Sequence, residues 1–117
     1  MRTEVLADRA RPILTQVARF GQTVTYGQLA ALITHPDEPL LDTRVMGKVL
    51  DVLAKTDSKA GVPYDLTAFV VNVHTGEVGK GWTSWLSSAP AKEQRLAATR
   101  YLKGRTFDDR RIIVIAG

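Results

Sequence analysis

The chain contains no cysteine. This absence excludes disulfide bonds, metal sites built on thiolates and any mechanism that uses a cysteine nucleophile. No apolar run approaches the roughly 20 residues that a helix needs to cross a bilayer. The first residues, MRTEVLADRARPIL, are too charged for a secretory signal. The sequence therefore predicts a cytoplasmic protein with no membrane partner.

Several signatures of enzymes and cofactor-binding proteins are also missing. The segment GEVGKG (76–81) lacks the strand-to-helix context and the Lys-Ser/Thr ending of a phosphate-binding loop. The two histidines, His35 and His74, fall in separate predicted loops and have no second ligand at metal spacing. The adjacent carboxylates Asp108 and Asp109 lie beside two arginines, which is more typical of a solvated turn than of an acid–base pair. We expect no enzymatic activity, no cofactor and no metal.

The chain has 117 residues. Sixteen of them are basic and twelve are acidic, which gives a formal charge of +4. The length suggests one compact domain over residues 1–117. The charge permits a polyanionic partner without requiring one. Residues 90–117 hold seven basic and three acidic residues, whereas residues 36–59 hold four basic and five acidic ones. The positive charge is therefore concentrated toward the C-terminal end.

Apolar residues at three- and four-residue spacing predict helices in four segments. Thr25 and Asp42 precede two of these segments and are expected to act as N-caps, because their side-chain oxygens can accept a hydrogen bond from the first turn. Gly21 follows the first segment as a helix stop. The predicted helices span Thr3–Arg19, Tyr26 to about Ile33, Thr43 to about Lys55 and Ala91–Leu102.

The remaining segments favour extended structure and turns. LTAFVVNV (Leu66–Val73) is the strongest strand signal in the chain. HTGEVGKG (74–81) is typical of a glycine-containing hairpin connection and leads to WTSW, whose two tryptophans we expect to close the hairpin over the core. RRIIVIAG (110–117) is a possible last strand.

This order of elements, a helix pair followed by a two-stranded hairpin, is that of a winged helix-turn-helix. In that arrangement the second helix of the pair faces DNA and the hairpin turn is the wing. We therefore predict an α+β fold, a winged helix-turn-helix with an added N-terminal helix and a C-terminal helix and strand.

Three segments between about Phe20 and Trp82 resemble a known family. RFGQTVTYGQLAAL, TRVMGKVL and LTAFVVNVHTGEVGKGW are similar to the DNA-binding domain of the alkylguanine-DNA alkyltransferases and alkyltransferase-like proteins. The resemblance implies that Tyr26 contacts the phosphate of a target nucleotide and helps to rotate it. It also implies that Arg44 enters the base stack and that Gly47 allows the helix to approach DNA closely.

The chain departs from this family at the reactive centre. The family's proline-cysteine-histidine-arginine core is replaced by LTAF, which puts Thr67 near the position of the cysteine. Alkyl transfer needs a thiolate that a neighbouring base activates. The family's catalytic activity is therefore not expected here, whereas the scaffold and its DNA face are.

The sequence thus predicts a non-catalytic protein that binds double-stranded DNA mainly through phosphates, with low sequence specificity. More modest roles stay open for two of the residues, because Tyr26 could be a packed aromatic and Arg44 could be a solvated residue paired with a nearby aspartate. The expected DNA-binding residues are Thr25, Tyr26, Gln28, Arg44, Gly47, Lys48 and Lys80.

Two other functions remain open. The first is a lesion sensor of the alkyltransferase-like kind that flips a base without repairing it. The second is a protein-binding adaptor on a winged-helix scaffold, since a fold does not fix a function. Asp42 and Asp51 support the adaptor, because carboxylates beside the recognition helix repel phosphate. Small basic proteins of this kind also occur in phages, which makes a host protein a conceivable target.

Overall fold

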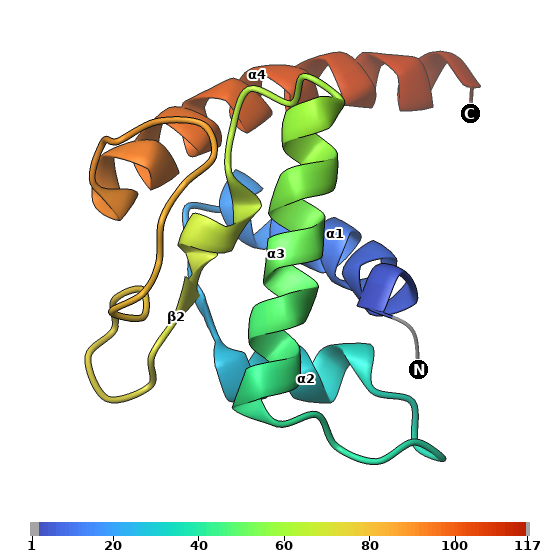
Figure 1. The fold of residues 1–117 in the computed structure, drawn as a ribbon. Coiled ribbons are helices and arrows are strands. Elements are labelled where there is room, and N and C mark those ends of the chain that lie inside the picture. The colour runs from blue at the N-terminus through green and yellow to red at the C-terminus, as the bar shows by residue number, and fades with distance from the viewer. Residues whose placement is uncertain (1–2, 117) are drawn as a thin grey trace.

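The computed structural model describes the backbone of residues 3–116 and the side chains of residues 3–104. Figure 1 shows α2 and α4 at opposite ends of the molecule, with α3 running between them and packed against α1. Within this range the chain is an α+β protein with four α-helices and a two-stranded sheet. Its elements are α1 (Thr3–Arg19), β1 (Val24–Thr25), α2 (Tyr26–Ile33), α3 (Thr43–Lys59), the 3-10 helix η1 (Leu66–Phe69), β2 (Val70–Val71) and α4 (Ala91–Ala116).

The hydrophobic core lies between α1 and α3 and is closed by η1 and α4. Helical periodicity turns Leu6 and Leu14 of α1 and Met46 and Leu53 of α3 inward, and Phe69 enters from η1; all five are buried. Each such side chain contributes roughly 1.5–3 kcal/mol through its removal from water. This packed core holds α2 and the loop after β2 in fixed positions.

The structure confirms both predicted N-caps. The Thr25 hydroxyl accepts a hydrogen bond from the Gln28 N–H, and Asp42 Oδ1 accepts one from the Val45 N–H at 2.9 Å. α3 continues one turn beyond the predicted end. In that last turn Asp57 is buried, and its carboxylate accepts a hydrogen bond from Arg11 Nε of α1 at 2.9 Å. This long-range ion pair holds a turn whose sequence alone did not predict a helix.

The predicted strand over Leu66–Val73 is mostly wrong. Residues 66–69 form η1, and only Val70 and Val71 are a strand. The Asp65 carboxylate accepts hydrogen bonds from both the backbone N–H and the hydroxyl of Thr67, which stabilises a turn. Residues 66–71 are also all buried rather than alternately exposed, and a short buried run is compatible with either conformation.

The predicted hairpin is also wrong. β2 pairs in parallel with β1, in the register Val24 to Val70 and Thr25 to Val71, and WTSW is not a strand. The chain after β2 forms instead a tight turn in which the Asn72 N–H donates to Glu77 O at 2.8 Å. Among the described residues β2 has no antiparallel partner. The loop from residue 72 to 90 is therefore built of turns rather than of a second strand.

The predicted strand at residues 110–117 is wrong as well, because the backbone from Ala91 to Ala116 is one continuous helix; Gly117 lies outside the described residues. Extending an existing helix adds a hydrogen bond for each residue fixed. A strand here would need a partner, and the sheet of the described chain consists only of β1 and β2.

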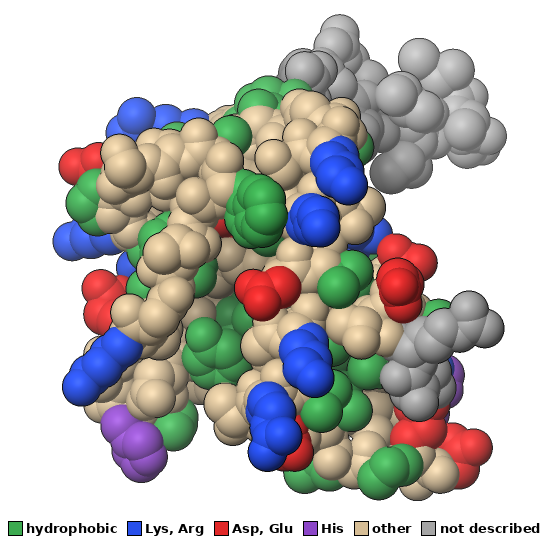
Figure 2. Space-filling model, viewed as in Figure 1, with side chains coloured by type: hydrophobic (Ala, Val, Ile, Leu, Met, Phe, Trp, Pro, Cys, Tyr) green, Lys and Arg blue, Asp and Glu red, His purple; other side chains and the backbone are tan. Residues whose placement is uncertain are grey.

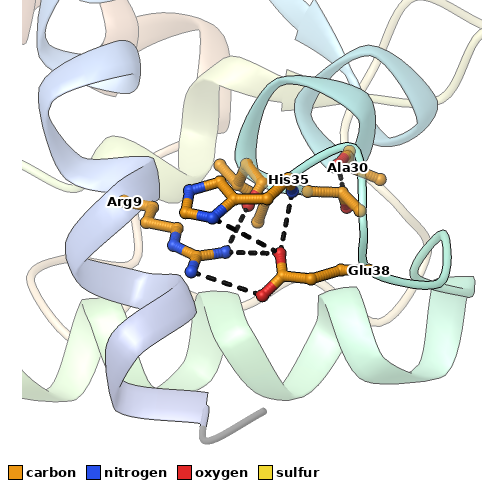
Figure 3. Close-up of polar contacts among 6 residues, drawn as sticks. Arg9, Ala30, His35 and Glu38 are labelled. Carbon is orange, nitrogen blue, oxygen red and sulfur yellow. Dashed lines mark hydrogen bonds and ion pairs between the residues drawn. The ribbon is translucent and has the colours of Figure 1, made fainter.

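The loop between α2 and α3 is tied to α1 by Arg9. Its guanidinium donates to Ile33 O at 2.9 Å and to Glu38 Oε1 at 2.8 Å, and Glu38 Oε1 also accepts from the His35 N–H (Figure 3). The hydrogen bond from Arg9, together with the one from the His35 backbone, lowers the pKa of Glu38 below its ordinary value. The contact fixes where α3 begins relative to α2.

Candidate nucleic-acid interface

The N-terminus of α2 carries a reciprocal cap. The Gln28 N–H donates to the Thr25 hydroxyl at 3.1 Å, and the Thr25 N–H donates to Gln28 Oε1 at 2.9 Å. This capping box explains why a threonine and a glutamine stand three residues apart at this point. The Gln28 amide group keeps its N–H donors and is exposed, so it remains available to an acceptor such as phosphate.

The exposed side of α3 carries a stripe of basic residues. Arg44, Lys48, Lys55 and Lys59 recur at intervals that place them on one face of the helix, and all four are exposed. None of them forms an ion pair within the part of the chain whose side chains are described. Asp51 is the acidic member of the same stripe. Figure 2 shows basic side chains along the course of α3 with acidic ones between them.

A pocket of about 240 Å³ lies between α2, α3, η1 and the loop after β2. Three aromatic residues, Tyr26, Trp82 and Trp85, contribute to its wall, together with Asp51 of α3. Hydrophobic side chains line the hollow beside α3 in Figure 2. Aromatic walls with a few polar groups are typical of sites for planar ligands, because the rings offer a stacking surface. The other lining residues are Gly47, Leu50, Ala54, Thr67, Gly79, Gly81 and Thr83.

A chain of hydrogen bonds holds one wall of this pocket. Trp82 Nε1 donates to the Thr67 hydroxyl at 3.0 Å, and the Thr67 hydroxyl donates to Asp65 Oδ1 at 2.6 Å. Thr67 and Asp65 are buried, and Asp65 Oδ2 has no hydrogen-bond partner among the described residues. The indole of Trp82 is therefore fixed against η1, whereas Trp85 is largely exposed at the pocket mouth.

Two of the residues that line this pocket are glycines whose surroundings differ. A Cβ added at Gly79 would lie 3.3 Å from the Tyr26 hydroxyl, so this loop position approaches the tyrosine closely. A Cβ added at Gly47, in the middle of α3, would meet nothing within 4 Å. Gly47 is thus not required by packing, and its missing side chain leaves open space next to the pocket.

The structure brings some of the residues predicted to bind DNA together at this pocket. Tyr26 and Gly47 line the same pocket, and Lys80 is exposed between its lining residues Gly79 and Gly81. Arg44 and Lys48 lie on the exposed side of α3 but do not line the pocket. The alternative in which Arg44 pairs with a nearby aspartate is not observed among the described side chains.

Sequence reasoning missed Thr67 as a pocket residue and favoured another role for the two tryptophans. They could stack on bases or lipid but were expected to close a hairpin over the core, whereas Trp82 and Trp85 line an open pocket. A signal did exist, since Thr67 aligns near the cysteine of the resembled family. Within the described side chains, no group of three or more potential ligands lies close enough together to hold a metal ion.

None of the helices in the described range is both long and apolar enough to cross a membrane. Comparisons of the chain with family models, curated proteins and solved structures found no match. The likeness to the alkyltransferase DNA-binding domain therefore stays a prediction from the residues.

Proposed function

We propose that the protein binds double-stranded DNA and catalyses no reaction on it. The binding surface, which we call the α2–α3 face, consists of the N-terminus of α2, the exposed side of α3 and the loop around Lys80. The observation that carries the proposal is the stripe of four exposed basic residues on α3, without ion pairs among the described side chains. A cation without a partner in the free protein can neutralise a DNA phosphate. The counterions that the phosphate releases then favour binding.

In this proposal α2 and α3 act as the helix pair of a winged helix-turn-helix, and the loop after β2 acts as the wing. The parallel pairing of β1 with β2 supports this, because the start of the loop then lies beside the N-terminus of α2. The backbone N–H groups at that terminus and the amide of Gln28 then add neutral phosphate donors. Such contacts position a protein on a duplex and carry little sequence information.

A salt titration with random duplex DNA tests the proposal. Replacing Arg44 and Lys48 together with Gln removes two phosphate contacts, so the slope of log affinity against log salt should fall by about 2. The matched control, Gln16→Glu with Ser88→Asp, lowers the net charge by the same two units at exposed positions outside the α2–α3 face. Equal effects of the two pairs, or no effect of the first, would overturn the proposal.

A second candidate, base flipping without repair, is supported by the pocket itself. Its aromatic residues and its volume of about 240 Å³ suit a planar ring, and it opens beside the proposed DNA-binding helix. Extruding a base is easiest at a mismatch, where less pairing energy is lost. A duplex with 2-aminopurine directly next to a mismatched base should therefore gain fluorescence when the protein binds, because the reporter loses a stacking neighbour as that base is extruded.

The Trp85→Ala variant should reduce that gain while keeping affinity for fully paired DNA, because Trp85 lines the pocket and lies off the basic stripe. Tyr26→Phe separates the hydroxyl from the ring and should weaken phosphate contact without unfolding the protein. If saturating protein leaves the 2-aminopurine emission unchanged, base flipping is rejected. The proposal of duplex binding is tested separately, by the salt titration.

A further inference from the structure

A second groove lies between α4 and the turn that follows α1, with a volume of about 560 Å³. We call it the α4 groove. One wall is the turn at Phe20 and Gly21, and the other is one side of α4. The two walls are joined at their base, where the Thr99 hydroxyl donates to Ala18 O at 2.8 Å. The α4 residues that line the groove are Lys92, Arg95, Leu96, Thr99, Arg100 and Lys103.

The charge in the α4 groove has a single sign. Four cationic residues line it and no carboxylate does, whereas Glu93 of α4 lines a different cavity. Arg95 is engaged by the protein itself, since it donates to Ala68 O and to Glu77 Oε1, both at 3.0 Å. The other three cations are exposed and form no ion pair among the described side chains.

Spacing along α4 makes these three cations a row. Lys92 lies about two turns before Arg100, Lys103 follows about one turn later on the same side of α4, and the row is about 16 Å long at 1.5 Å rise per residue. Cations spread along such a line match a partner that carries several negative charges along a chain. A phosphodiester chain has that property.

An exposed aromatic ring completes the groove. Phe20 is 71% exposed, although large apolar side chains are normally buried. It is placed there by the end of α1, where Gly21 takes a φ of +65° and the chain turns toward β1. A phenyl ring beside cations offers one face for stacking a nucleic-acid base, and this contact tolerates any base.

We propose that the α4 groove binds single-stranded nucleic acid. Phosphates lie along Lys92, Arg100 and Lys103, and an unpaired base stacks on Phe20. A single strand is favoured over a duplex because the bases of a duplex are already stacked on one another and cannot cover this ring. The site is separate from the α2–α3 face and does not depend on the function proposed for that face.

Anisotropy titrations with labelled oligo-dT and with an abasic oligomer of the same length test the proposal. Replacing Lys92, Arg100 and Lys103 with Gln should lower the salt slope for oligo-dT by about 2, from a slope of roughly 0.7 per phosphate contact. Phe20→Ala should weaken oligo-dT binding about tenfold and leave the abasic oligomer unaffected. Because all four side chains are exposed, the unfolding midpoint should stay near that of the parent.

The Arg44→Gln, Lys48→Gln pair removes two cations outside the α4 groove, and for each cation removed it should lower the oligo-dT salt slope less than the triple variant does. The proposal is overturned if the triple variant keeps the parent's salt slope, or if Phe20→Ala affects both oligomers equally. It is also overturned if poly-glutamate of equal charge competes as well as oligo-dT, since the groove then recognises acidic peptide. Failure of the α3 variants to change duplex binding would reject only the α2–α3 face.

Discussion

Replacing Gly47 with Ala separates the stability of α3 from its proposed contact with DNA. Gly47 lies in the interior of a 17-residue helix, and a Cβ there would meet no atom within 4 Å. Alanine is favoured over glycine by about 1 kcal/mol inside a helix. Because the new methyl group meets no neighbour, the free protein should gain most of this energy, and its unfolding midpoint should rise by about 4 °C.

The same methyl group should weaken DNA binding, because it occupies space that the approaching duplex fills. Overpacking of this kind costs roughly 1–3 kcal/mol, which lowers affinity by about tenfold or more. Gly104→Ala in α4 is the matched control, since its Cβ also meets nothing within 4 Å and it should stabilise the helix without affecting duplex binding. Thermal unfolding and duplex titration measure the two effects. A stabilised Gly47→Ala variant with unchanged affinity would refute close approach at this point.

Two predictions concern the ties between α1 and the elements that carry the α2–α3 face. Arg11→Ala should cost about 2 kcal/mol of unfolding free energy, because it leaves the buried Asp57 carboxylate without its charged donor. Asp8→Ala, which removes the exposed partner of the same arginine, should cost less than about 0.5 kcal/mol by chemical denaturation; equal costs would refute the assignment. Glu38 should make stability fall in acid: its pKa is lowered by Arg9, so its contribution is complete above the ordinary value of 4.5 and is lost as the pH falls through the lowered pKa. The difference in unfolding free energy between the parent and Glu38→Gln should therefore shrink below pH 4.5, and a constant difference would count against the ion pair.

Helices were predictable because their signals are local. The capping residues Thr25 and Asp42 and the apolar repeat of α1 lie within a few positions of what they determine. The last turn of α3 was not predictable, since it depends on Asp57 meeting Arg11 across 46 positions. The pairing of β2 was missed for the same reason, because nothing near Val70 indicates that its partner is Val24 rather than the following segment.

The candidate site was predictable only in part. The resemblance placed Tyr26 and Gly47 at one surface, and the structure puts both in one pocket. It did not indicate that Trp82 would turn into the same pocket, because that depends on a hydrogen bond to Thr67, which is 15 positions earlier. Side chains brought together by turns leave little periodic signal, and the loop from residue 72 to 90 is built of turns.

The environment of Thr67 supports our proposal that the pocket recognises a planar ring. Thr67 stands near the position where the resembled family has its nucleophile, but its hydroxyl accepts from Trp82 and donates to Asp65. The side chain is buried, and both its hydroxyl and its backbone N–H donate to Asp65 at the start of η1. These contacts keep the aromatic wall of the pocket rigid, and rigidity is what a stacking site for a planar ring requires.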